Sequence, residues 1–159
     1  MRLNNKGITL IEIIVVMAIV GILVGSSFVA IQYIQFGNTK KCVAKIEDEL
    51  DRLLVETMSK KEKRYFYLFK TADGYFVTLD KDKKRENLEQ KEAIKVAGSS
   101  VVIEADGQSI NEENMIKIGY QKEGGAFSND AYCSQITIEG NGTYRLHLVK
   151  DTGLHYLEP

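Results

Sequence analysis

The sequence is poor in several residue types, and each shortage excludes a class of protein. Its only proline is the last of 159 residues, so long helices and strands can run without interruption. Two cysteines are too few for a disulfide-built scaffold or a four-cysteine zinc site. The formal net charge of -1 lacks the basic excess that is usual in nucleic-acid-binding proteins. The charged fraction of 27% is ordinary and argues against a wholly disordered chain.

The chain also lacks the short motifs of common enzyme classes. It contains no phosphate-binding loop, no glycine-rich dinucleotide fingerprint and no Ser-His-Asp order. The two histidines, His147 and His155, have no third ligand indicated beside them. Asp80 and Asp82 stand among lysines, which is unfavourable for calcium. We therefore expect no catalytic residue, no metal site and no cofactor.

One long apolar run near the start is the strongest positive feature of the sequence. Residues 13–39 carry no charge, and about 20 apolar residues cross a bilayer as a helix. Arg2 and Lys6 precede the run and favour a cytoplasmic N-terminus, although two lysines follow it. A secretory signal peptide and a plain single-pass anchor are alternatives, but neither accounts for Glu12, a carboxylate at the start of the run.

The residues around Glu12 form a motif, Lys6-Gly7-Ile8-Thr9-Leu10-Ile11-Glu12. This motif resembles the cleavage and assembly signal of type IV pilins and pseudopilins. That signal has a short basic leader ending in glycine, then a hydrophobic residue, usually Phe, and then Thr-Leu-Ile-Glu. The assembly residues Thr9, Leu10, Ile11 and Glu12 match in order, and Ile8 replaces the usual Phe.

The resemblance implies a processing and assembly pathway. A membrane prepilin peptidase would cut between Gly7 and Ile8, remove the leader 1–7 and N-methylate Ile8. Glu12 would then pair with the N-terminal amine of a neighbouring subunit, because each charge is costly alone in an apolar setting. Considered by itself, Glu12 has the alternative of lying shallow, near lipid headgroups. The implied partners are the peptidase, other pilin or pseudopilin subunits, and the cytoplasmic membrane with its assembly platform.

The apolar run continues into an amphipathic pattern. Apolar residues recur at steps of three and four, with charged residues between them. The predicted buried face consists of Cys42, Val43, Ile46, Leu50, Leu53, Leu54 and Met58. One helix is expected from Ile8 to about Ser59, about 75–80 Å long. Its apolar half, 8–37, would span the membrane or lie in a filament core, and its amphipathic half, 38–61, would pack under a domain.

After the helix, a period-two pattern predicts an antiparallel β domain over 62–159. Tyr65–Lys70 and Tyr75–Leu79 flank an Asp-Gly turn and predict a hairpin. The charged segment Asp80–Lys95 is expected to be a solvated loop or a short exposed helix. Further strands are expected at 93–97, 100–105, 115–120, 136–139 and 144–150, the last two joined through Gly-Asn-Gly. The fold class is therefore α+β, a long helix packed on an antiparallel β-sheet domain, as the resemblance to pilins also implies.

The β domain also resembles, loosely, the small minor pseudopilins of type II secretion and competence systems. The similar segments are Ile118-Gly119-Tyr120, Gly125-Ala126-Phe127, Ile136-Thr137-Ile138 and Thr152-Gly153. This likeness implies a minor pilin or pseudopilin whose β domain lies outside the cytoplasmic membrane. The rivals are an adhesion or motility pilus, a DNA-uptake or secretion pseudopilus, and a single-pass binding or sensor domain that never polymerises. Nucleic acid is a conceivable partner, but no basic stripe indicates it.

The two cysteines leave two alternatives open. Cys42 lies on the predicted helix and Cys133 on a late strand, and exported domains occupy compartments where disulfides form. A bond between them would close a loop of about 90 residues and contribute up to about 4–5 kcal/mol in the chain-entropy model. The other alternative is two buried free thiols, because cysteine is often buried without a bond.

Overall fold

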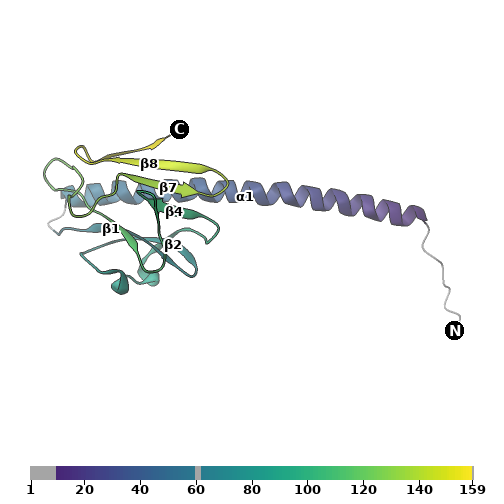
Figure 1. Cartoon of the computed structure of the whole chain (residues 1–159), viewed down its shortest axis with the longest axis horizontal. Helices are drawn as coiled ribbons and strands as arrows, with labels where there is room; N and C mark the ends of the chain where they lie inside the picture. The colour runs from purple at the N-terminus through teal and green to yellow at the C-terminus, as the bar shows by residue number, and fades with distance from the viewer. Residues whose placement is uncertain (1–9, 60–61, 159) are drawn as a thin grey trace. The chain divides into compact units, whose positions relative to one another are not determined.

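The computed structural model describes residues 10–59 and 62–158, and it describes the backbone alone for residues 25–37. These residues form one α-helix, α1 (Leu10–Ser59), nine β-strands and two short 3-10 helices, η1 (Arg85–Asn87) and η2 (Gln90–Glu92) (Figure 1). The chain divides into two compact units, Met1–Gln35 and Phe36–Pro159. The predicted α+β class is confirmed, because a helix is combined with antiparallel sheets only.

The part of α1 in the second unit is amphipathic, as its sequence period predicts. Its most deeply buried apolar residues are at most 2% exposed: Cys42, Val43, Ile46, Leu50 and Leu53. The assignment of Met58 to the buried face is wrong, because its side chain is 55% exposed. Thr57, four residues after Leu53 and therefore on the same side of the helix, takes the buried position instead. Met58 follows one residue later, about 100° further round the axis.

A four-stranded sheet has the strand order β3-β2-β1-β6. Its strands are β1 (Tyr65–Thr71), β2 (Gly74–Asp80), β3 (Ile94–Ala97) and β6 (Met115–Ile118). The predicted first hairpin is confirmed, and Thr71 pairs with Gly74 across a two-residue loop. Gly74 has a φ of +128°, and a Cβ at this position would collide with the carbonyl oxygen of Ala97. Glycine is therefore required at this strand start by both conformation and space.

A five-stranded sheet has the order β5-β4-β7-β8-β9. Its strands are β4 (Val102–Ala105), β5 (Gln108–Ser109), β7 (Gln135–Glu139), β8 (Thr143–Val149) and β9 (Leu154–Glu158). The hairpin predicted at Gly-Asn-Gly joins β7 to β8. The sequence predicted one sheet, whereas the domain has two, and it missed β5 and β9. The reason is that β5 has only two residues and β9 does not alternate between apolar and polar residues.

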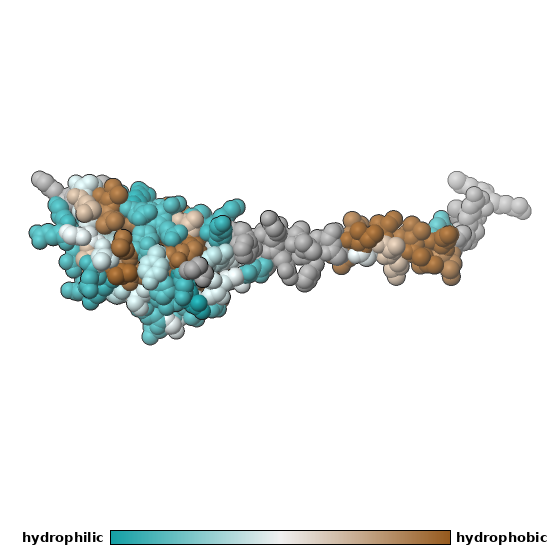
Figure 2. Space-filling model, turned by 90° about the horizontal axis from the view of Figure 1, so that it is seen from above, coloured by the Kyte–Doolittle hydropathy of each residue, from teal (hydrophilic) through white to brown (hydrophobic). Residues whose placement is uncertain are grey.

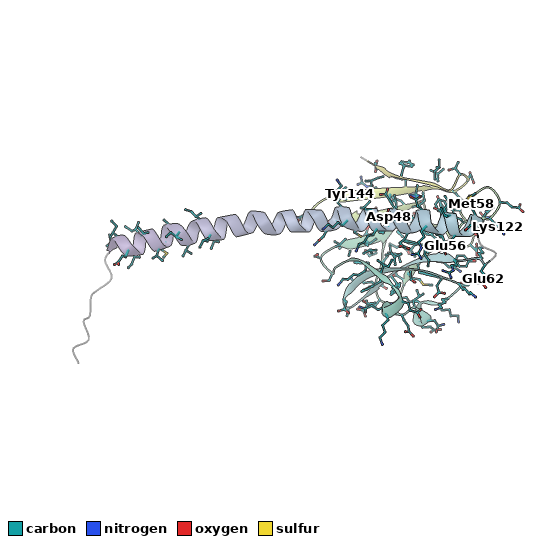
Figure 3. All side chains as sticks on the ribbon, turned by 180° about the vertical axis from the view of Figure 1, so that it is seen from behind. Asp48, Glu56, Met58, Glu62, Lys122 and Tyr144 are labelled. Carbon is teal, nitrogen blue, oxygen red and sulfur yellow. The ribbon has the colours of Figure 1, made fainter. Side chains whose placement is uncertain are left out.

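One main core joins α1 to both sheets. In Figure 1, β8 is drawn above the C-terminal part of α1 and β1 and β2 below it, and Figure 3 shows the same part from behind. A second, smaller cluster covers the other face of the four-stranded sheet. In β1, Phe66 and Leu68 belong to the main core, whereas Tyr65, Tyr67 and Phe69 belong to the second cluster. Both faces of this strand are buried, which explains its uninterrupted apolar and aromatic run.

The charged segment between β2 and β3 is largely exposed, as predicted, and contains the two 3-10 helices. One of its residues, Leu88, is only 7% exposed and packs into the second cluster. Lys83 N–H donates to the Tyr67 hydroxyl at 2.8 Å, and that hydroxyl donates to the Lys81 carbonyl at 3.1 Å. The segment is therefore attached to the sheet through an apolar contact and a buried tyrosine.

Candidate functional site

The apolar segment, defined here as Leu10–Val24 of α1, exposes apolar side chains on every side of the helix. Ile13, Ile14, Val15 and Val16 are 50–58% exposed. Successive residues are separated by about 100° around a helix, so these four positions cover its whole circumference. Figure 2 shows this segment as an almost uniformly hydrophobic surface, in contrast to the mixed surface of the β domain.

A helix that is apolar all round differs from an ordinary surface helix, which has one apolar stripe. Such a helix is typically buried in a membrane or in the core of a larger structure. In residues 10–59 and 62–158, no helix reaches the combined length and hydropathy that mark a membrane span. The large apolar side chains of Leu10–Val24 are at least 47% exposed, so these described residues form no buried core of their own.

Glu12 is the only charged residue of the apolar segment, and it lies in the first turn of α1. The N-terminal end of a helix has a partial positive charge, which stabilises a carboxylate by about 0.3–1 kcal/mol at an exposed site. Leu10 and Ile11 precede it in the same turn and are 79% and 69% exposed. Burying this turn in apolar surroundings would be costly for the carboxylate unless a cation came with it.

Part of the predicted site lies outside the described residues. This part comprises the leader 1–7, the cleavage pair Gly7 and Ile8, and Thr9. The structure brings Leu10, Ile11 and Glu12 together in one helical turn. Cleavage, methylation and pairing of Glu12 with an amine remain predictions.

Cys42 and Cys133 are free thiols, so the disulfide alternative is wrong. Both side chains are buried, at 0% and 6% exposure, and both belong to the main core. Cys133 precedes β7 and does not lie on a strand, contrary to prediction. Burial raises the pKa of each thiol to about 12, and the charges of Lys45 beside Cys42 and of Asp106 beside Cys133 have smaller effects. The two cysteines therefore act as small apolar core residues.

The two histidines lie on neighbouring strands but on opposite faces. His147 is paired with Tyr156, and the next position along β8, Leu148, is paired with His155. His147 stacks on the Tyr156 ring at 5.3 Å between centroids, whereas His155 Nε2 lies 3.5 Å from Asp51 Oδ1 of α1. Within the part of the chain that the structure describes, no three potential metal-binding side chains come together.

The two aspartates at and just after the end of β2, Asp80 and Asp82, form ion pairs with lysines. Asp80 Oδ2 is 2.6 Å from Lys83 Nζ, and Asp82 Oδ1 is 2.6 Å from Lys117 Nζ. Burial opposes ionisation of Asp80, but hydrogen bonds from Lys83 Nζ and Lys81 N–H lower its pKa overall. The hydrogen bond from Lys117 is the main cause of the lowered pKa of Asp82. These carboxylates are thus partners of the protein's own lysines.

Sequence reasoning missed two buried hydroxyl groups in the domain, those of Thr57 and Tyr120. Thr57 is 5% exposed and Tyr120 is 1% exposed, and among the described residues neither hydroxyl oxygen has a hydrogen-bond partner. The available signal for Thr57 was its place four residues after Leu53, on the buried side of α1. No sequence signal indicates that Tyr120 lies near it, because that proximity depends on how the loop after β6 folds back.

Comparison with known proteins bears on the N-terminal residues. Residues 2–28 match the family pattern described as the prokaryotic N-terminal methylation motif. No curated protein and no solved structure matches the chain at a significant level. The matched range includes Gly7, Ile8, Glu12 and the whole apolar segment Leu10–Val24. Residues 2–28 are therefore the prokaryotic N-terminal methylation motif, the prepilin signal of type IV pilins and pseudopilins.

Proposed function

We propose that the protein is a structural subunit of a type IV pilus-like filament, a minor pilin or pseudopilin, and not an enzyme. The observation that carries this proposal is the methylation motif at residues 2–28, which runs into a helix that is apolar on all sides. Exposed apolar surface of this extent is unfavourable in water, so we expect it to be buried against other apolar groups. The helix is buried in lipid before assembly and packs against neighbouring apolar helices afterwards.

In this proposal a prepilin peptidase cuts between Gly7 and Ile8 and N-methylates Ile8. Residues 8–37 then hold the subunit in the cytoplasmic membrane, with the domain 62–159 on the outer side. An assembly platform transfers the subunit from the membrane into the filament, where the same apolar helix packs against other subunits. The pilin fold of the family, with the β domain carried on the helix, suits both stages.

Glu12 gives the assembled filament its register. Cleavage creates a new amine at Ile8, which is a cation, and Glu12 is the only charge in the apolar segment. Each group is destabilised by apolar surroundings, and pairing between subunits offsets part of that cost. A subunit that slides out of register leaves both charges unpaired, so the pair selects one stagger between helices.

The decisive experiment is mass spectrometry of the mature N-terminus, purified from the native host. We expect a chain that begins at N-methylated Ile8. A Gly7→Leu variant is the control and should keep the start at Met1, because the peptidase needs the small residue at the cut. A wild-type chain that begins at Met1 would refute the proposal and favour a single-pass binding or sensor domain that does not polymerise.

A second experiment tests the role of Glu12. Glu12→Gln removes the charge and keeps the shape, and breaking a buried ion pair costs about 3 kcal/mol or more. We expect normal cleavage and membrane insertion but about a hundredfold less incorporation into filaments, measured by immunoblot of the sheared filament fraction. The matched control is Asp51→Asn, a carboxylate on the exposed side of α1 in the domain. Incorporation of Glu12→Gln at the wild-type level would contradict the pairing.

The kind of machine is tested by deleting the gene. Loss of adhesion or motility indicates a pilus, loss of transformation indicates a DNA-uptake pseudopilus, and loss of an exported protein indicates a secretion pseudopilus. The loose likeness of the β domain to minor pseudopilins favours the last two. Direct nucleic-acid binding is not part of the proposal.

A further inference from the structure

Two lysines and two carboxylates on α1 have side chains without a partner in the described part of the chain. They are Lys40, Lys41, Glu47 and Asp48, and among the described residues none of these side chains forms a hydrogen bond or an ion pair. Both lysines and Asp48 are exposed, and Glu47 is half-buried. Figure 3 shows Asp48 on the part of α1 that runs through the domain. We call these four residues the charged stripe.

The remaining charged residues of α1 in the domain all have partners. Arg52 pairs with Glu49 and Glu56, Asp51 pairs with His155, and Lys45 Nζ donates to the Lys95 carbonyl. The charged stripe also lies on the side of α1 away from the main core. Lys41 is nine residues before the fully buried Leu50, which places the two about 180° apart around the helix axis. The domain therefore leaves the charges of the stripe uncompensated and its side chains outside the core.

The order and the spacing of the four charges are regular. Two positive residues come first, and each carboxylate follows a lysine by seven residues: Glu47 follows Lys40, and Asp48 follows Lys41. Seven residues make nearly two turns of a helix, so each lysine and its carboxylate point the same way, about 10 Å apart along the axis. Ion pairs within one helix join residues three or four apart, so this spacing does not serve pairs inside the chain. It suits pairs between two helices that lie side by side with a shift of seven residues.

We propose that the charged stripe binds the charged stripe of a second copy of the chain, displaced along the helix axis by about 10 Å. This inference rests on the proposed function, because subunits inserted into one membrane all point the same way. At that shift Lys40 and Lys41 of one copy lie level with Glu47 and Asp48 of the other. Copies without the shift would place lysine beside lysine and carboxylate beside carboxylate, and like charges repel. The contact uses different residues on the two copies, so each copy also binds a further one, as an open helical filament requires.

Two other features of α1 bear on this arrangement. Lys45 and Arg52 are also seven residues apart and would meet as like charges. Each is held within its own chain, Lys45 by the Lys95 carbonyl and Arg52 by two glutamates, which keeps it from turning toward a neighbour. The pair between Glu12 and the amine of residue 8 joins positions only four residues apart. A subunit in a helical filament has several neighbours, and we assign the two contacts to different ones.

The first test traps the contact in filaments of the native host. Ala44 and Asp51 are exposed, seven residues apart and on the same side of α1 as the charged stripe. Full chains carrying Ala44→Cys and Asp51→Cys, each with its own tag, are produced together and oxidised in intact cells. We expect a disulfide-linked dimer with both tags in the sheared filament fraction, at least about tenfold more abundant than the dimer from Ala44→Cys alone. The two cysteines of the wild-type chain are buried and do not interfere.

The outcomes of this test separate the inference from the proposed function. An equally abundant dimer from Ala44→Cys alone would show level or antiparallel helices and would overturn the inference. The N-terminus of the chain is measured by mass spectrometry in the same fraction. Filaments whose chains begin at residue 8 but contain no mixed dimer overturn this inference alone. Chains that begin at Met1 and are absent from the filament fraction overturn both the inference and the proposed function.

The second test uses charge reversal to identify the partner. The variants are Lys40→Glu with Lys41→Glu, Glu47→Lys with Asp48→Lys, and all four reversals together. Each double variant places like charges in the contact and should reduce incorporation into filaments about tenfold. The fourfold variant restores opposite charges between copies and should incorporate as the wild type does. The control, Lys84→Glu with Lys91→Glu, makes the same change as the first variant at exposed positions after β2 and should have no effect. If the fourfold variant is as defective as the double variants, another kind of subunit faces the charged stripe, and the proposal of a second copy is overturned.

Discussion

Leu10 and Leu50 are the same residue in the same helix, and their environments are opposite. The side chain of Leu10 is 79% exposed, whereas that of Leu50 is fully buried in the main core. Full burial of a leucine side chain contributes about 1.5–3 kcal/mol to folding, so Leu50 stabilises the domain and Leu10 does not. The comparison teaches that the two units of α1 treat apolar residues differently: the second unit buries them in its core, and the first leaves them exposed.

The largest expected effect is on the reactivity of the two core cysteines, which tests how well the core excludes solvent and reagents. At pH 8 a thiol with a pKa of about 12 has about a thousandfold less thiolate than an ordinary cysteine, and the thiolate is the form that reacts. We expect Cys42 and Cys133 to be alkylated by iodoacetamide at least about a thousandfold more slowly in the folded chain than in urea. Mass spectrometry over time gives both rates. Equal rates would show that the core is open, and mapping without reductant should find no bond between the two.

The next prediction tests the difference between Leu10 and Leu50 directly with a matched pair of leucine variants. Leu50→Ala should destabilise the domain by about 2–5 kcal/mol, because it removes buried atoms and leaves a cavity. Leu10→Ala should change domain stability by less than about 0.5 kcal/mol. Urea unfolding of the full chain in detergent, followed by the near-ultraviolet dichroism of the tyrosines, measures both. Similar losses for the two variants would mean that the apolar segment belongs to the folded core after all.

A smaller effect separates backbone conformation from packing within the domain. Gly153 and Gly124 both have positive φ, at +68° and +84°. A Cβ at Gly153 would collide with the Gly125 carbonyl oxygen, whereas a Cβ at Gly124 meets open space. Gly124→Ala should therefore cost about 1–2 kcal/mol from conformation alone, and Gly153→Ala should cost more. Urea unfolding compares them, and equal costs would argue against close packing between the β8–β9 turn and the loop after β6.

The smallest effect concerns the acid side of the stability curve. The pKa of Asp80 is lower in the folded chain than its unfolded pKa of about 3.9. The ionised carboxylate therefore adds to the free energy of unfolding above the unfolded pKa, and this stabilisation is lost as pH falls through the folded pKa. The free energy of unfolding of the wild type should decrease as pH is lowered from about 5, and it should decrease less steeply in Asp80→Asn. Lys83→Met should make the decrease less steep as well, because it removes the partner that lies 2.6 Å away. Unfolding midpoints between pH 3 and 7 check this, and unchanged slopes in both variants would contradict it.

Local pattern predicted the elements well where one residue type or one period decides the structure. The three- and four-residue steps from Cys42 to Leu53 predicted the buried face of α1. The Asp-Gly and Gly-Asn-Gly sequences predicted the two hairpins, because glycine permits the conformations that tight turns require. The prediction that Met58 is buried was wrong because the final turn of the helix buries Thr57 in its place.

The pairing of strands and the state of the cysteines were not predictable in the same way. An antiparallel strand can pair with any other strand of suitable length, and the division into two sheets depends on contacts between residues far apart in the chain. A disulfide between Cys42 and Cys133 was equally a question of distance, and the folded chain keeps both as free thiols. The same holds for the burial of Thr57 and Tyr120, which come from distant segments.

By itself, the sequence determined the leader motif at residues 2–28, the all-round apolar start of α1 and the switch to an amphipathic period, because each is a property of neighbouring residues. Only the tertiary structure decided that β1 is buried on both faces, that Met58 is exposed and that Thr57 and Tyr120 are buried. The physical reason is that burial is a sum over contacts from the whole chain. A local pattern indicates which face of an element is apolar, and only packing decides whether that face, or also the opposite one, is covered.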